Sequence, residues 1–264
     1  MKSFWKAAAA VASLVLASCG GGDGNAAISK TFNYAAGQAP NANEQSAATS
    51  AQSAVSSTST FNTTPDSNNA SLIIGLADEL AVSALGSSPV GASPIAQDPR
   101  LRHAMRNAVT SACTVVTATS VTFNSCTEIE SGYTFTLSGN ITAAAGTVTW
   151  DIHGAFTGTS NGFSINLNLH QSGALTVTST TVVGQGLSEI SGSVSGQGQS
   201  VSFGLDTAAM VNLTYSPTCV TSGTLEVKRV WSQRPQGATG PDFADVAVKL
   251  TWTGCNTIQV QHST

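Results

Sequence analysis

Residues 133–141 read YTFTLSGNI, and apolar and polar side chains alternate along this stretch. Residues 148–156 (VTWDIHGAF) and 163–169 (FSINLNL) show the same period of two. Such alternation is typical of antiparallel strands with one buried and one solvated face, whereas strands of a parallel sheet read as continuous apolar runs. Further alternating runs lie at 175–177, 201–205, 211–215, 225–230 and 246–252. Together these runs predict an antiparallel meander of about ten strands over residues 114–262.

Two amphipathic helices are expected just upstream of the sheet. Leucine and isoleucine recur at steps of three and four residues over 71–85, and Asp98 and Pro99 are typical of the start of a second helix over 98–110. The apolar face of the sheet needs a cover, and these helices can supply it. The predicted fold class is therefore mainly β with two or three short helices: a curved antiparallel meander or open barrel wrapped on amphipathic helices.

Two other architectures fit the composition less well. A transmembrane barrel also has alternating strands, but aromatic residues make up 6% of the chain, too few for the expected girdles. A parallel β-helix suits the richness in serine, threonine and glycine, but it requires a fixed repeat period that this sequence lacks.

The first 18 residues have the anatomy of a signal peptide. Lys2 and Lys6 form a positive region, and residues 7–16 form a short apolar run before small residues. A helix needs about 20 residues to cross a hydrocarbon core of about 30 Å, so this run is too short to span a bilayer. Residues 1–18 are therefore expected to be removed.

Leu16, Ala17 and Ser18 directly precede Cys19. This stretch resembles the processing box of bacterial lipoproteins, in which a leucine-like residue and two small residues precede an invariant cysteine. The resemblance covers the N-terminus alone. It implies that Cys19 becomes the first residue of the mature chain and carries acyl chains such as palmitate. The alternative is an ordinary secretory signal in which Cys19 is incidental.

The lipid anchor has consequences for localisation. Two or more acyl chains give stable membrane binding, whereas one chain alone is marginal. Gly20 follows the cysteine, and by the same resemblance an aspartate at this position would favour retention in the inner membrane. The protein is therefore expected in the cell envelope, anchored in the outer membrane and facing the periplasm or the exterior.

Composition divides the mature chain into a tether and one body. Residues 20–25 read GGGDGN, and residues 35–70 consist almost entirely of small and polar side chains. Residues 19–70 are therefore expected to be a flexible tether, in which alanines at helical spacing permit a weak helix over 43–55. Residues 71–264 are expected to form a single domain.

Assigning Cys19 to lipid leaves an even number of cysteines, namely Cys113, Cys126, Cys219 and Cys255. Export to an oxidising compartment then favours two disulfides, for which three connectivities exist. The most economical pairs are 113 with 126 and 219 with 255. A metal site is disfavoured because the spacings contain no close cysteine pair.

The second cysteine pair also predicts a strand register. Placing Leu225 opposite Leu250 and Val227 opposite Val248 brings Cys219 and Cys255 to the open end of a hairpin. This pairing is a specific expectation for the structure.

The charge balance limits the partners. Charged residues make up 9% of the chain, the net charge is −4, and no basic run with interleaved aromatic residues is present. Nucleic acid is therefore not expected as a partner, because nothing would neutralise its phosphates. We expect no cofactor, and the expected partners are the membrane, an envelope protein or an apolar small molecule.

One polar cluster stands out among the strands. Pairing Phe156 with Phe163 across a turn at 158–162 would place Asp151 diagonal to His170, on the face that also carries His153. Such a cluster can hold a metal or transfer protons, but exposed histidines and a carboxylate are more often solvated surface. The sequence therefore predicts no catalytic, cofactor or metal residue, and no serine lies in a nucleophile elbow.

A second candidate site is the connection after Trp231, which runs from Ser232 to Asp242 and is long for a hairpin loop. Long ordered loops on rigid sheets often carry recognition, whereas the alternative is a mobile tip without a role. Trp231, Arg234 and Asp242 are the residues expected to bind if the loop binds a partner.

Three functions remain from the sequence. The favoured one is a noncatalytic lipoprotein, not an enzyme, with a structural or binding role in the envelope. The second is a carrier of lipid or another apolar ligand, which would bind in the concave sheet near Trp150, Phe163 and Leu167. The third is a hydrolase, which requires Ser, His and Asp within mutual hydrogen-bonding reach.

Overall fold

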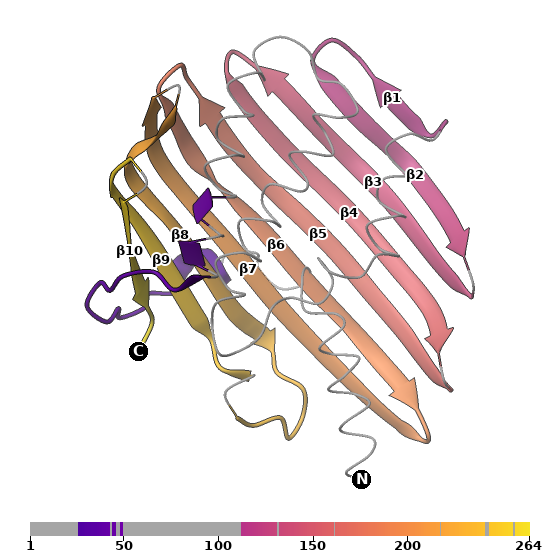
Figure 1. The fold of residues 1–264 in the computed structure, drawn as a ribbon. Helices are drawn as coiled ribbons and strands as arrows, with labels where there is room; N and C mark the ends of the chain where they lie inside the picture. The colour runs from indigo at the N-terminus through magenta and orange to yellow at the C-terminus, as the bar shows by residue number, and fades with distance from the viewer. Residues whose placement is uncertain are drawn as a thin grey trace.

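The fold is that of a computed structural model, which describes residues 26–42, 44–45, 48–49 and 112–264 except 131, 161, 217, 241, 242 and 256. One open, ten-stranded antiparallel sheet dominates it, and strands that are neighbours in space are also neighbours in sequence (Figure 1). The strands are β1 (Thr114–Val116), β2 (Ser120–Glu130), β3 (Tyr133–Ala144), β4 (Thr147–Ser160), β5 (Phe163–Val177), β6 (Thr181–Gly196), β7 (Gln199–Ser216), β8 (Cys219–Gln233), β9 (Val246–Gly254) and β10 (Thr257–His262). The predicted mainly β antiparallel meander is confirmed.

Helix is scarce in the described residues. α2 spans Ala26–Ser29, and residues 44–45 and 48–49, inside the predicted range 43–55, are helical. The predicted helices 71–85 and 98–110 lie outside the described residues, so a sheet wrapped on them stays a prediction. No helix in the described ranges is long and apolar enough to cross a membrane.

Two-residue turns set the register of the central hairpins. β3 connects to β4 through Ala145 and Gly146, and β6 connects to β7 through Gln197 and Gly198. These four residues have φ values of 49°, 78°, 52° and 75°, the pattern of type I′ turns, whose twist matches that of the paired strands. One register then continues from β3 to β7.

The predicted register of β4 and β5 is wrong. Phe156 pairs with Leu167 instead of Phe163, because β4 extends to Ser160 and β5 begins at Phe163. The first residues of the segment 158–162, expected to be a loop, therefore belong to β4. An Asn-Gly pair between two strands favours this tighter turn.

The central strand β6 was not among the alternating runs. Glycines replace apolar side chains at several of its inward positions, which lowers its strand propensity. The neighbouring strand uses the space: a Cβ on Gly192 would lie 2.6 Å from Leu167, and one on Gly196 would lie 2.5 Å from Phe163. β6 is thus held by its partners on both sides.

One face of the sheet, called the inner face below, carries the core. Its largest cluster of buried side chains extends from β2 to β10 and includes Phe135 and Trp150. A second cluster, which includes Phe203 and Trp231, lies toward the other end of β5 to β8. A row of polar side chains, all buried except the partly buried Ser188, crosses the inner face between them in register: Gln171, Ser188, Thr207 and Arg229. The core is therefore not purely apolar.

Two inward glycines bend the sheet. Gly139 in β3 and Gly223 in β8 have φ values of 119° and 117°, which side-chain-bearing residues rarely adopt. A Cβ on either glycine would lie 2.1 Å from a carbonyl oxygen of the adjacent strand, that of Asp151 or of Asn212. Glycine kinks of this kind let a sheet curve around its core.

We expect Gly223→Ala to lower the free energy of unfolding by more than about 2 kcal/mol, because it combines a strained φ with a backbone clash. Gly132→Ala is the matched control: its φ is 84°, but nothing lies within 4 Å of the added Cβ. It should lose only about 1 kcal/mol. Urea denaturation measures both values, and equal losses would show that the close approach contributes nothing.

The N-terminal residues form a strap, a name used here for residues 26–49 as far as the structure describes them. The strap begins on the outer face, opposite the inner face, where Ala27 packs with Leu187 and Val230. Lys228 of β8 donates hydrogen bonds to the carbonyl oxygens of Ile28 (3.3 Å) and Lys30 (2.9 Å). These contacts hold the first described residues of the predicted tether 19–70 against the sheet.

The strap then crosses the β10 edge of the sheet (Figure 1). Gln38 exchanges two backbone hydrogen bonds of 3.0 Å with Val260, and the backbone N–H of Ala35 donates to the carbonyl of His262 at 2.9 Å. Ala48, further along the strap, belongs to the main core of the inner face. Backbone groups at this end of the sheet are thus paired within the chain, which protects the edge against pairing with another molecule.

A capping box starts the helical part of the strap. The backbone N–H of Asn41 donates to Glu44 at 2.7 Å, and the backbone N–H of Glu44 donates to the Asn41 side chain at 3.0 Å. The other oxygen of the buried Glu44 carboxylate lies 2.9 Å from Nε2 of His262. Glu44 therefore joins the strap to the last strand.

Both predicted cysteine pairs are present. Cys113 bonds to Cys126 and Cys219 to Cys255, with Cα separations of 5.3 and 5.5 Å. The predicted register of β8 and β9 is also confirmed, since residue 225 pairs with 250 and residue 227 with 248. The first disulfide ties the short edge strand β1 to β2. The second joins the first residue of β8 to the residue that follows β9.

Replacing Glu44 by alanine should destabilise the protein by about 1–3 kcal/mol, because the cap and the partner of His262 are lost together. The neighbouring Gln45 is exposed, so Gln45→Ala should change stability by no more than about 0.5 kcal/mol. Hydrogen exchange at Gln38 and Val260 reports whether the strap opens. Unchanged exchange in the Glu44 variant would contradict a fastening role.

Candidate functional site

A row of ionisable side chains crosses the outer face of the central strands. His153 of β4 is the direct partner of His170 of β5, which is the partner of Glu189 of β6, which in turn faces Asp206 of β7. Asp151 lies two residues before His153 and so shares its face. Five residues from four strands are thereby placed side by side by register alone.

The contacts within this row are close. Nε2 of His170 lies 2.8 Å from Oδ1 of Asp151, and Nε2 of His153 lies 3.2 Å from the same oxygen. Nδ1 of His170 forms a hydrogen bond with the carboxylate of Glu189. The two imidazole rings stack nearly parallel, with centroids 4.4 Å apart and planes 3° apart.

Burial of these side chains increases from β4 to β7, and it contributes to the pKa shifts of His170 and Asp206. Burial lowers the pKa of His170, but the hydrogen bonds to Asp151 and Glu189 outweigh it and hold this pKa above its ordinary value. Burial raises the pKa of Asp206, the Ser232 hydroxyl that donates to it at 2.9 Å lowers it, and the charge of Glu189 raises it further, with a net increase. The row therefore concentrates negative charge beside one imidazole.

This arrangement limits the possible chemistry. Both ring nitrogens of His170 are directed at carboxylates, so neither is directed at a serine hydroxyl as a catalytic triad requires. The side chains can instead hold a cation, either a proton on the imidazole or a metal ion between the ligand atoms.

The predicted cluster Asp151, His153 and His170 is brought together, although by a different register. Asp151 is opposite Ser172 and lies diagonal to His170. Glu189 and Asp206 were not expected in the cluster. The charged residue in the glycine-rich segment 181–196 was a signal for Glu189, but it points to the outer face only once that segment is known to be a strand.

The predicted recognition loop is placed differently. Trp231 is buried in the second core cluster, and its ring centroid lies 5.4 Å from that of Phe243. Arg234 is half exposed, and its Nη2 lies 3.2 Å from Asp245. Asp242 lies outside the described residues.

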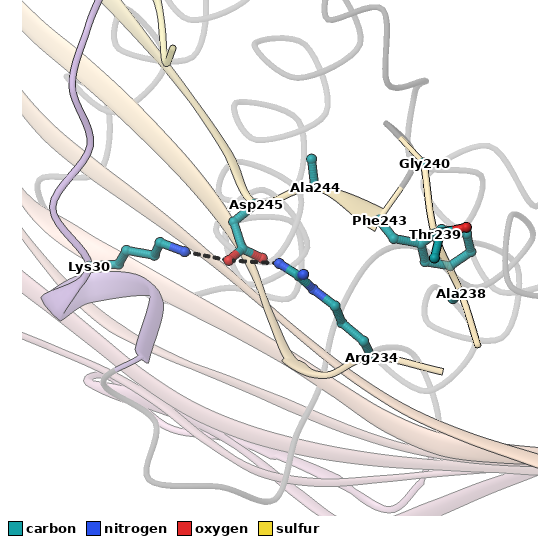
Figure 2. Close-up of a pocket in the computed structure, with 8 residues that line it drawn as sticks. All are labelled: Lys30, Arg234, Ala238, Thr239, Gly240, Phe243, Ala244 and Asp245. Carbon is teal, nitrogen blue, oxygen red and sulfur yellow. Dashed lines mark hydrogen bonds and ion pairs between the residues drawn. The ribbon is translucent and has the colours of Figure 1, made fainter. Parts of the chain in front are cut away.

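A surface pocket of about 530 Å³ lies at this loop. Figure 2 shows Asp245 at its centre, between Lys30 of the strap and Arg234. The backbone N–H of Trp231 also donates to Asp245, at 2.9 Å. The remaining lining residues are Ala238, Thr239, Gly240, Phe243 and Ala244. Asp245 thus connects the strap to the loop, and the carboxylate compensates both cations.

The other sequence candidates have clear positions. Trp150, Phe163 and Leu167, expected to line a cavity in a carrier, are buried side chains of the two core clusters. Of the other histidines, His262 pairs with Glu44, and His103 lies outside the described residues.

Comparisons with protein-family models, curated proteins and solved structures find no match to this chain.

Asp245 gives a pH-dependent prediction. Burial raises its pKa, but hydrogen bonds from Lys30, the Trp231 backbone and Arg234 outweigh burial and lower it below its ordinary value. Asp245→Asn should therefore destabilise the protein by about 2 kcal/mol at pH 7. The contribution is present above the unfolded pKa of about 3.9 and is lost as the pH falls through the lower folded pKa.

Urea denaturation at pH 7 and pH 2.5 measures this effect. The stability gap between Asp245→Asn and the wild type should narrow at the lower pH, whereas Thr239→Ala, from the same pocket, should show no gap at either. A gap of equal size at both pH values would mean that the charge of Asp245 is not the cause.

Proposed function

We propose that this protein is a lipid-anchored lipoprotein of the cell envelope, held in the outer membrane, whose sheet has a noncatalytic structural or binding role. The observation that carries the proposal is the stretch from Leu16 to Cys19, preceded by two lysines and an apolar run. This stretch resembles a lipoprotein processing box and supplies a thiol for acylation.

The cysteine pairing supports export. Cys113, Cys126, Cys219 and Cys255 all form disulfides, and such bonds persist in oxidising compartments. The chain has five cysteines, and these two disulfides leave only Cys19 without a cysteine to pair with. A lipid on its thiol accounts for the odd number.

The strap supports a body that stays close to the bilayer. Residues 20–25 separate Cys19 from α2, which packs on the outer face. An extended chain advances at most about 3.5 Å per residue, so about 25 Å at most separates the anchor from the packed chain. A membrane-proximal sheet with fastened edges suits a structural or binding role.

Intact mass spectrometry of the detergent-extracted protein tests the anchor. We expect the wild type to lose residues 1–18 and gain acyl mass on Cys19, and Cys19→Ala to lose both the acyl mass and the detergent-phase partitioning. Asn25→Ala leaves the processing box intact and should behave as the wild type. An unmodified Cys19 in the wild type would overturn the proposal.

Native mass spectrometry of the delipidated body then separates the roles. A body without a copurified small molecule supports the structural or binding role. A body that retains lipid would replace this role with that of an apolar-ligand carrier.

A further inference from the structure

We propose that Asp151, His153 and His170 form a binding site for a divalent first-row transition-metal ion, of the class of Zn²⁺, Ni²⁺ or Cu²⁺. The three residues each offer one ligand atom, and these atoms all lie within 4.8 Å of one another. Imidazole nitrogen with carboxylate oxygen suits these ions, whereas Ca²⁺ and Mg²⁺ prefer oxygen ligands alone. This site is independent of the lipid anchor.

The sheet geometry brings the ligands to one point. Asp151 and His153 are two residues apart on β4 and so share a face, and His170 is the direct cross-strand partner of His153. Ligands at about 2.1 Å from a tetrahedral ion are about 3.4 Å from one another. The observed distances from Oδ1 of Asp151, 2.8 and 3.2 Å, are close to this value. The two rings are stacked and the three ligand atoms lie within 4.8 Å of one another, so the imidazoles must turn about their side-chain bonds for both Nε2 atoms to face one ion.

Glu189 prepares His170 as a ligand. Its carboxylate is buried, with 5% of the side chain exposed, and it contacts Nδ1 of His170. Because a carboxylate only accepts hydrogen bonds, Nδ1 carries the proton, and the lone pair of a neutral ring is then on Nε2. Metal-bound histidines commonly have a carboxylate in this position, which fixes the ring and raises its basicity.

The position of His153 favours a metal over a simple ion pair. Asp151 and Glu189 already satisfy both nitrogens of His170, so an ion pair needs no second imidazole. His153 nevertheless stacks on His170 and directs its Nε2 at the same oxygen of Asp151. A metal ion would use Nε2 of both imidazoles together with this oxygen.

Access and charge also fit. The side chains of Asp151, His153 and His170 are 62%, 56% and 31% exposed, so an ion can enter from solvent and keep water on its open positions. Asp206 adds negative charge next to Glu189 on the protected side. The three proposed ligands are therefore open to solvent, whereas the carboxylate of Glu189 behind His170 is buried.

Isothermal titration of the detergent-solubilised full chain, stripped with a chelator, tests the site with ZnCl₂ and CuCl₂. We expect one ion per chain, with the affinity lowered at least tenfold in His153→Ala and in His170→Ala. Glu189→Gln should lower it about 10- to 100-fold, as for other second-sphere carboxylates. Asn166→Ala, on the same face of β5 and exposed, is the matched control and should bind as the wild type.

Electron paramagnetic resonance of the Cu²⁺-loaded chain gives a readout that does not depend on stability. We expect hyperfine splitting from two nitrogen nuclei in the wild type and from one in His153→Ala. Absence of binding in the wild type, or splitting unchanged in both histidine variants, would overturn the proposal. The acylation of Cys19 is measured separately, so failure here leaves the lipoprotein proposal standing.

Discussion

The register of the central hairpins decides which side chains meet on each face of the sheet. Because successive residues of a strand point to opposite faces, a shift by one residue would exchange the buried and solvated sets. The type I′ turn formed by Gln197 and Gly198 holds β6 and β7 in one pairing. The same pairing buries Ile190 against Leu205 on the inner face and sets Glu189 opposite Asp206 on the outer face. Core and polar row are thus two results of one constraint.

An open sheet leaves two edges, and the chain treats them differently. β1 is only three residues long and is tied to β2 by a disulfide, which limits the edge it offers. At β10 the strap pairs through Gln38 and continues to the inner face, where Glu44 meets His262. The strap therefore contacts the outer face, the β10 edge and the inner face of the sheet in turn. An anchor attached just before it would pull on a segment held by many contacts.

The polar row concentrates charge where the strap approaches the sheet. Ala27 packs on Leu187, which lies two residues before Glu189 on the same face of β6. The Glu189 side chain is only 5% exposed, and burial strengthens its interaction with His170. The hydrogen bond from Glu189 consequently holds the His170 ring in one orientation, while Asp151 and His153 are exposed to solvent. A rigid, one-sided arrangement of this kind can bind a cation without reorganising the sheet.

The sequence by itself determined the alternation, and with it the antiparallel meander. It also favoured both cysteine pairs and the pairing of β8 with β9. It also indicated that Asp151, His153 and His170 share a face, because a period of two is a local property of a strand. The placement of Glu189 was decided only by the tertiary structure, since the glycine-rich β6 is a strand only through its two neighbours. The strap was likewise invisible in composition: its small and polar side chains resemble a linker, and Ala27 and Glu44 become buried only where a complementary surface from β7, β8 or β10 meets them. Local patterns specify which face a side chain occupies, whereas contacts between residues some two hundred positions apart depend on the completed sheet.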